Sequence, residues 1–300
     1  MLRTIYKQRL LFIMSLPFVI YVFVFTYIPI WGWIIAFLDY KPGGTILKSK
    51  FVGFKYFIEM FSSASFYLAL RNTLIMSVLN LVLGTVISVL FAILLNELRS
   101  MAFKRTVQTI SYLPHFVSWV VVAGIFGRLL AIDGGTINDL LFKLNLISDP
   151  IPFQMKGEWY WGIVTFANIW KETGWSAIIY IAVLVTINVE LYEAATADGA
   201  SRFRRIWHIS LPGIKNTIVI MVVLQTGWLL GVGFDQALLM GNNAVMQYSD
   251  VLSTYVMRYG IQMGRFSFAT AAGIFQSLIG LIMVVSSNYL AKKVSNTQIF

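Results

Sequence analysis

Six long apolar stretches dominate the pattern of hydrophobic and polar positions along the 300-residue chain. A bilayer with a hydrocarbon core of roughly 30 Å takes about 20 helical residues to cross. We therefore expect an all-α integral membrane protein that forms a single domain over residues 1–300. The predicted transmembrane helices cover residues 10–38, 72–95, 107–130, 160–187, 214–234 and 269–291.

Composition agrees with a membrane protein. Hydrophobic residues make up 58% of the chain and charged residues 12%, with a mean hydropathy of +0.75. Because an ordinary globular chain is roughly a quarter charged, this chain has too little charge to solvate a soluble surface. The sequence contains no cysteine, which excludes disulfides, thiolate metal ligands and a cysteine nucleophile.

The distribution of lysine and arginine predicts the orientation of the helices, because cytoplasmic segments carry an excess of these residues. One set of connecting segments holds 12 basic residues, and the other set, nearly twice as long, holds nine. The first set comprises residues 1–9, 96–106, 188–213 and 292–300 with Lys215, and the second comprises residues 39–71, 131–159 and 235–268. Both termini are therefore expected in the cytoplasm. The net charge of +10 is then a topology signal, with attraction to membrane lipid as a secondary effect, and it does not indicate nucleic-acid binding.

The sequence lacks the motifs of common catalytic sites. The patterns G-x-x-x-x-G-K-[ST], G-x-S-x-G and H-E-x-x-H do not occur, so no P-loop, nucleophile elbow or zinc-protease helix is expected. The two histidines, His115 and His208, are too few for a histidine metal centre. We expect no catalytic residue, no metal site and no cofactor on this chain, and hence no enzyme activity of its own.

The segment between the fourth and fifth predicted spans indicates two short helices joined by a tight turn. An alanine-rich helix over residues 191–197 is expected to end where Gly199 adopts a left-handed conformation. Ser201 is a candidate N-cap for a second helix, which should stop near Pro212. These features leave two interpretations open: a helical hairpin held on the lipid headgroups by arginines, or a docking surface whose small residues admit a partner closely.

This segment also resembles a known motif. Its residues are Glu193-Ala194-Ala195-x-x-Asp198-Gly199-Ala200, followed by Ile209-x-Leu211-Pro212. The pattern is similar to the EAA loop of binding-protein-dependent ABC importer permeases of the maltose type, apart from Ile206, where the family usually has phenylalanine. The resemblance implies that the loop is a coupling helix that docks into a groove on an ATP-hydrolysing subunit. Glu193 would make a polar contact with that subunit, and Ala195, Gly199 and Ala200 would sit in the groove.

Other segments narrow the resemblance to LplB-like permeases. They include Phe25-x-Tyr27-Ile28-Pro29, Leu95-Asn96-Glu97-Leu98-Arg99 and Trp170-Lys171-x-x-Gly174-Trp175. This group serves oligosaccharides released from alginate, pectin and other polymers, so the resemblance implies a multi-pass permease subunit in the bacterial plasma (inner) membrane. The implied partners are a second homologous permease, two ATPase subunits or domains that bind ATP and Mg, and an extracytoplasmic solute-binding protein.

Two spans place polar and aromatic residues at a similar expected depth. Asn168, Glu172 and Trp175 share one face of the fourth span because they are spaced i, i+4 and i+7. Gln225 and Trp228 lie in the fifth span, which runs in the opposite direction. Hydrogen-bonding groups and flat rings suit the hydroxyls and C–H faces of sugars, so we expect a substrate path here. The resemblance to maltose-type permeases implies the same location.

Lys171 and Glu172 are a charged pair deep within a predicted span, where ionisable residues face the bundle interior or a wet cavity. As neighbours on a helix they point about 100° apart, so we expect each to have a separate partner. Two roles stay open for them, a structural pairing across the bundle and a contact with substrate, and both are included among the six candidate residues of the substrate path: Asn168, Lys171, Glu172, Trp175, Gln225 and Trp228. For His115, next to Pro114, the alternatives are satisfying backbone groups that the proline frees and a role in transport.

Two alternatives to an oligosaccharide ABC permease remain at this level. A stand-alone ion-coupled secondary transporter would need intramembrane carboxylates or broken helices at matching places in two repeats. The chain offers one such carboxylate and no detectable repeat. An ABC permease for a non-sugar solute is the other alternative, because such systems share the EAA loop.

Overall fold

The computed structural model describes residues 9–231 and 233–295. Residues 1–8 and 296–300, which belong to the predicted cytoplasmic segments, lie outside this range. Helices dominate the two compact units of the chain. One unit comprises Met1–Ser63 and Val256–Phe275, and the other comprises Ala64–Tyr255 and Gln276–Phe300.

The first unit begins with an apolar helical run of 29 residues. It joins α2 (Arg9–Val22), the π-helical turn η1 (Phe23–Tyr27) and the 3₁₀ segment η2 (Ile28–Phe37). The other elements of this unit are β1 (Leu38–Asp39), η3 (Ile46–Lys48), β2 (Lys50–Phe51), α3 (Lys55–Phe61), η9 (Met257–Ile261) and the start of α15 (Phe266–Ser295). The strands β1 and β2 form an antiparallel ribbon with Leu38 opposite Phe51. The sequence did not predict this ribbon, because two-residue strands are too short to show alternation.

Polar contacts hold the ribbon of the first unit against its neighbours. The Tyr56 hydroxyl donates to Asp39 Oδ1 at 2.6 Å, and the Ser267 hydroxyl donates to the Leu38 carbonyl at 2.6 Å. Arg265 and Glu59 form an ion pair at 2.5 Å. The hydrogen bond from Tyr56 lowers the pKa of Asp39, and burial, with that bond second, raises the pKa of Tyr56 to about 12. The bond is therefore favoured at neutral pH, where Asp39 is ionised and Tyr56 is protonated.

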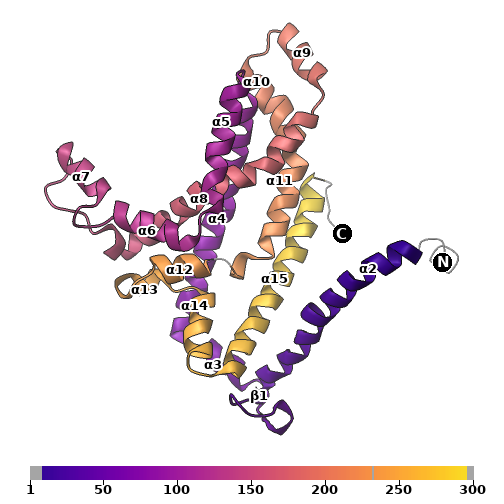
Figure 1. Ribbon diagram of the computed structural model, residues 1–300, viewed down its shortest axis with the longest axis vertical. Helices are drawn as coiled ribbons and strands as arrows, with labels where there is room; N and C mark the ends of the chain where they lie inside the picture. The colour runs from indigo at the N-terminus through magenta and orange to yellow at the C-terminus, as the bar shows by residue number, and fades with distance from the viewer. Residues whose placement is uncertain (1–8, 232, 296–300) are drawn as a thin grey trace. The chain divides into compact units, whose positions relative to one another are not determined.

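The second unit contains the longest helices (Figure 1). Its elements are α4 (Ala64–Asn96), α5 (Met101–Tyr112), η4 (Leu113–Phe116), α6 (Trp119–Leu129), α7 (Thr136–Lys143), η5 (Phe153–Met155), α8 (Gly157–Thr186), α9 (Val189–Ala197), α10 (Arg202–Arg205), η6 (Ile206–Ser210), α11 (Leu211–Thr226), η7 (Leu229–Gly231), α12 (Phe234–Met240), η8 (Asn243–Val245), α13 (Met246–Ser249), α14 (Leu252–Val256) and the rest of α15.

The core of this unit lies between α4, α8 and α11. Buried residues of these three helices, among them Ala92, Tyr180 and Ile214, form one cluster. Helix α5 also packs closely on α8, because Gly174 faces the Ser111 backbone and a Cβ at position 174 would collide with the Ser111 carbonyl. These contacts bring helices together that are far apart in the sequence.

Helical runs account for four to six candidate membrane spans in the described part of the chain. Four runs are long and apolar enough by themselves, and the number reaches six if each of two bent helix pairs is one span. The prediction of an all-helical membrane protein is confirmed in this coarse form. The third predicted span, 107–130, is not one continuous helix: Met101–Phe116 and Trp119–Leu129 meet at 102°. Pro114 lies at this break, and Ser118 caps the new helix by accepting from the Val121 N–H.

Two predicted helix ends were wrong. The helix after Ser201 does not stop near Pro212, since the helical run continues from Arg202 to Thr226. The π-helical turn η6 precedes the proline, and the Leu211 N–H donates to the Ile206 carbonyl five residues earlier, so the ladder adjusts to the proline. The fifth predicted span, 214–234, ends instead at Thr226, where a glycine-rich stretch follows and disfavours helix.

Candidate functional site

A cavity of about 260 Å³ lies among α4, α8 and the end of α11 with η7. Four of the six residues that the sequence assigned to a substrate path line it: Asn168, Glu172, Gln225 and Trp228. Side chains from the shared face of α8, from α11 and from the segment after α11 thus border one space. Trp228 is 77% exposed, so its indole is available at the edge of the cavity.

The other two predicted path residues, Lys171 and Trp175, do not line this cavity. Trp175 stacks on the His115 ring with the ring centroids 4.4 Å apart and the planes 2° from parallel. The i+7 spacing placed Trp175 on the face of Glu172, but the break between α5 and α6 covers that turn of α8 with His115. The aromatic ring of Trp175 therefore supports the helix break.

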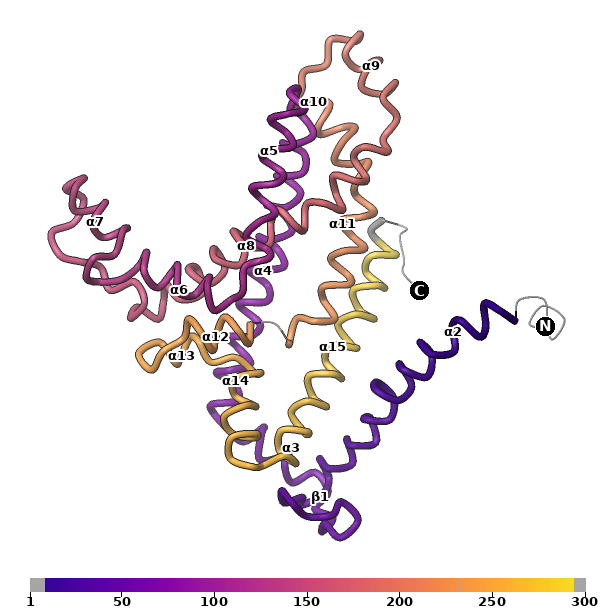
Figure 2. The backbone as a smooth tube through the Cα atoms, in the orientation of Figure 1, coloured from indigo at the N-terminus to yellow at the C-terminus, as the bar shows by residue number. Residues whose placement is uncertain are grey.

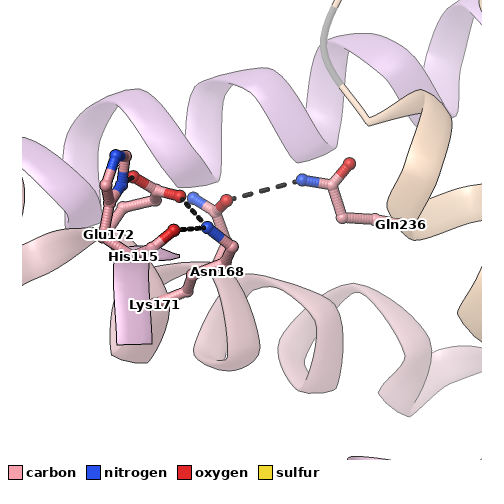
Figure 3. A network of polar contacts seen from close by, with 5 residues as sticks. All are labelled: His115, Asn168, Lys171, Glu172 and Gln236. Atoms are coloured by element: carbon pink, nitrogen blue, oxygen red, sulfur yellow. Dashed lines mark hydrogen bonds and ion pairs between the residues drawn. The ribbon is translucent and has the colours of Figure 1, made fainter. Parts of the chain in front are cut away.

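Lys171 joins this break to α8 through a small polar network (Figure 3). Its side chain is buried at 7% exposure, and Nζ donates to the His115 carbonyl at 2.6 Å and to Glu172 Oε1 at 2.9 Å. Glu172 Oε2 lies 2.7 Å from His115 Nδ1. A buried amino group is stable only when it is paired, and the carbonyl freed by the bend and the carboxylate supply that pairing.

This network corrects two sequence-based expectations. Lys171 and Glu172 were expected to have separate partners, but they contact each other, because their long side chains converge on His115 although their Cβ atoms diverge. His115 does not itself satisfy the backbone freed at Pro114. Lys171 binds the His115 carbonyl, and the imidazole contacts Glu172.

Polar residues that the sequence analysis missed also belong to the site. Gln236 of α12 is buried, and its Nε2 makes a long contact of 3.5 Å with Asn168 Oδ1 (Figure 3). On α4, Ser77 lines the cavity and donates to the Leu229 carbonyl. Asn80 and Thr85 of α4 line the cavity as well. The available signal was the series of polar side chains within an otherwise apolar helix, which places them toward an interior.

The loop that resembles the EAA motif connects α8 to α11, the two helices that supply the predicted path residues other than Trp228 (Figure 2). Helix α9 bends 69° away from α8, and Asn188 caps it by accepting from the Glu190 N–H at 3.0 Å. Glu193 and Ala194 are exposed on α9. Sequence placed the start of this helix at Leu191, two residues late, because the cap lies at Asn188.

The turn after α9 has the predicted geometry at Gly199, whose φ is +72°. The Gly199 N–H donates to the Thr196 carbonyl at 3.0 Å, and the Ala200 N–H donates to the Ala195 carbonyl at 2.8 Å. These two bonds are the Schellman pattern that satisfies the last carbonyls of a helix. Asp198 is the C-cap residue, and the turn therefore needs no partner to hold its shape.

Ser201 begins the next helix, as its sequence position predicted. Its hydroxyl accepts from the Arg204 N–H at 3.4 Å. Phe203 and Trp207 follow on the exposed surface with stacked rings 6.3 Å apart. Arg205 reaches back to the Thr196 hydroxyl at 2.6 Å, so the two short helices are tied together across the turn.

Comparisons with known proteins agree with this architecture. Residues 84–296 match the family described as "Binding-protein-dependent transport system inner membrane component". The chain is 42% identical over 294 residues to the polygalacturonan/rhamnogalacturonan transport system permease protein YteP of Bacillus subtilis (strain 168), covering 98% of this chain and 91% of YteP. It is 40% identical over 294 residues to protein LplB of the same organism, covering 98% of this chain and 92% of LplB.

The fold is also similar to that of a solved transporter chain. In the crystal structure of a bacterial alginate ABC transporter in complex with an alginate pentasaccharide-bound periplasmic protein, one chain matches with a TM-score of 0.90 and 37% identity over 99% of both chains. Permeases of this family carry no cofactor, and the ATPase activity of the system resides in separate subunits. The chain therefore belongs to the multi-pass inner-membrane components of binding-protein-dependent transport systems, the permeases of ABC transporters.

Proposed function

We propose that the chain is one permease subunit of an ATP-driven importer for oligosaccharides derived from polysaccharides. The observation that carries this proposal is the match over 99% of the chain to the alginate transporter, together with a polar cavity at the predicted substrate path. YteP is named for polygalacturonan and rhamnogalacturonan, so fragments of acidic polysaccharides are the first substrates to test.

The arrangement of the helices supports two different roles for the predicted path residues within one permease domain. Asn168, Glu172, Gln225 and Trp228 line the cavity and would contact the sugar along the path. Lys171 and Trp175 would act indirectly, because they hold the helix break at His115 beside Glu172. In this proposal the residues of α8 nearest the path are positioned by the break between α5 and α6.

The turn at Gly199 would couple the cavity to ATP hydrolysis. With both termini and this loop on the cytoplasmic side, as the lysine and arginine bias indicates, α9 and the turn would face a groove of an ATPase subunit. The exposed Glu193 and Ala194 and the small residues Ala195 and Ala200 suit such a contact. The self-satisfied turn would transmit motion as a rigid element.

In the complete importer, this chain would contact four kinds of partner. A second homologous permease would complete the path, two ATPase subunits or domains would bind ATP and Mg, an extracytoplasmic binding protein would deliver the oligosaccharide, and lipid would surround the helices. ATP binding would close the ATPase pair, draw the coupling helices together and turn the path outward. Hydrolysis would then reset the assembly after the sugar has entered.

Reconstitution tests this function against ion-coupled transport. Proteoliposomes that hold this chain with its partner subunits and binding protein should take up oligosaccharide only when ATP is supplied. The matched control is the chain alone under a proton or sodium gradient, which should give no uptake above empty vesicles. Uptake by the chain alone would contradict the proposal and favour a secondary transporter.

A further inference from the structure

The cavity has a wall formed by α4 that the predicted substrate path does not include. Ser77, Asn80, Gly84 and Ser88 line it at spacings i, i+3, i+7 and i+11, so they share one face of the helix. The other lining residues, Asn168 among them, belong to α8, to α11 and to the segment that follows α11. Polar groups from α4 and from α8 thus border the same space.

Unpaired polar atoms concentrate in this cavity. Within the described ranges, six buried side-chain nitrogen or oxygen atoms have no hydrogen-bond partner, and three of them belong to cavity-lining residues: Asn80 Oδ1, Thr85 Oγ1 and Thr173 Oγ1. A buried polar atom without a partner costs roughly 1–3 kcal/mol. In a membrane-embedded bundle, hydrocarbon offers no replacement partner. These atoms are themselves buried, so a ligand with hydroxyl groups would reach them only after the side chains rotate toward the cavity.

The charge in the cavity is already neutralised. Among the described residues, Glu172 is the one charged residue in the cavity lining. Its two carboxylate oxygens contact Lys171 and His115. The hydrogen-bonding capacity left over consists of neutral amide and hydroxyl groups. Such groups read the hydroxyl pattern of a sugar ring.

The space beside α4 is set by a glycine. A Cβ added at Gly84 would meet no atom within 4 Å, so the helix leaves open volume on the cavity side at this position. The cavity that this chain lines by itself has a volume of about 260 Å³, and Gly84 is part of its lining.

We propose that α4 supplies part of the sugar site: the part-exposed Asn80 lines the cavity and is a specificity-determining residue whose side-chain amide hydrogen-bonds a sugar hydroxyl, and Gly84 leaves room for the ring. The inference rests on the proposed function and deepens it. The cavity would recognise the hydroxyl groups of the sugar. It would not bind the carboxylates of an acidic oligosaccharide, because the cavity lining offers them no unpaired cationic side chain among the described residues.

A matched pair of glycine variants tests the space beside α4. Gly84→Leu should fill the cavity and lower the kcat/KM of ATP-driven uptake more than tenfold, with normal yield of the purified complex. Gly162→Leu is the control, because Gly162 is also helical, also has no atom within 4 Å of an added Cβ and does not line this cavity. The probes are trigalacturonate, a rhamnogalacturonan tetrasaccharide and alginate pentasaccharide.

Asn80→Ala tests recognition without adding bulk. Loss of one hydrogen bond should raise the KM for the best of these probes roughly two- to tenfold. We would compare uptake of that probe with uptake of analogues that each lack one hydroxyl. The wild-type complex should transport one of these analogues less well than the parent probe, and Asn80→Ala should lose only this difference. Because both complexes use the same binding protein, the preference of that protein cancels, and a structural role for Asn80 would not change the ratio.

The outcomes separate the inference from the function on which it rests. If the wild type transports a probe but Asn80→Ala keeps the same discrimination against every analogue, the α4 site is wrong and the proposed function stands. The α4 site would also be overturned if Gly84→Leu and Gly162→Leu had the same kcat/KM. If the wild type transports none of the three probes, the oligosaccharide function and the α4 site are overturned together.

Discussion

The cavity between α4, α8 and α11 and the turn at Gly199 satisfy their polar groups in opposite ways. In the cavity, Asn80 and Thr173 leave oxygen atoms unpaired. At the turn, the carbonyls of Ala195 and Thr196 both accept hydrogen bonds within the loop. The cavity thus holds unpaired side-chain atoms, whereas the backbone of the turn is paired and presents a fixed shape, although Nε of the nearby Arg205 is unpaired. In the proposed function, the cavity would bind the oligosaccharide and the turn would dock the ATPase subunit.

The cavity and the turn are joined by two helices, so a movement of the turn would displace residues of the cavity. Helix α8 carries Asn168 and Glu172 of the cavity and continues past a 69° bend into α9. Helix α11 leads from the other side of the loop to Gln225. In the proposed importer, the turn between these helices would link the ATPase contact to the cavity without an additional element.

The largest expected effect comes from the turn. In Gly199→Val, a β-branched residue would have to adopt φ near +72°, which costs roughly 1–2 kcal/mol and is rarely tolerated. We expect the ATPase subunit to be lost from the purified complex, while the helices still insert. Co-purification of the ATPase measures this directly.

Gly199→Asn is the matched control, because asparagine tolerates the left-handed conformation. An added Cβ meets no atom within 4 Å in this chain, so any defect shared by Asn and Val must arise from bulk against the partner. Retention of the ATPase by Gly199→Val would contradict the docking role of this turn.

The next effect concerns the buried network that supports the cavity. Lys171→Met leaves the His115 carbonyl and Glu172 without the amino group that now binds both. Because Lys171 is buried but Glu172 is 31% exposed, removing the amino group is expected to cost about 1–3 kcal/mol, less than breaking a fully buried ion pair. The thermal midpoint of the detergent-purified complex should fall, and the double variant Lys171→Met/Glu172→Gln should recover part of the loss. A single variant as stable as the wild type would show that the network is dispensable.

A smaller effect is expected from the cavity-lining face of α11. Gln225→Ala should lower oligosaccharide uptake roughly two- to tenfold by removing one hydrogen-bonding side chain, with complex yield unchanged. Trp175→Ala should also lower uptake, but through loss of the stack on His115. Its defect should therefore be accompanied by a lower thermal midpoint, which Gln225→Ala should not show. Unchanged uptake in both variants would place the path elsewhere.

The smallest effect should follow Glu193→Ala. Glu193 is exposed on α9, and an ion pair at an exposed rim is worth about 1 kcal/mol or less. We expect the ATPase to remain bound, with stimulated hydrolysis reduced severalfold or less. Titrating ATPase binding at two salt concentrations checks the polar nature of this contact. A Glu193→Ala defect as severe as that of Gly199→Val would contradict the difference in roles.

Sequence predicted local features better than contacts between distant segments. The turn at Gly199 follows from neighbouring residues, because a glycine after an alanine-rich helix and a serine two positions later define both caps. The contact between Lys171 and the His115 carbonyl depends on a 102° break, and the pattern of apolar residues does not specify a bend angle. The α4 wall was missed because isolated polar residues such as Asn80 within an apolar helix do not by themselves identify the space they face.

The most direct test of the permease assignment is oligosaccharide-stimulated ATP hydrolysis by the reconstituted complex. The chain would be assembled with its partner permease and ATPase subunits in proteoliposomes, and hydrolysis would be compared with empty and oligosaccharide-loaded binding protein. Our account predicts stimulation by the loaded binding protein in the wild type and none in Gly199→Val. Equal hydrolysis with empty and loaded binding protein in the wild type would contradict it.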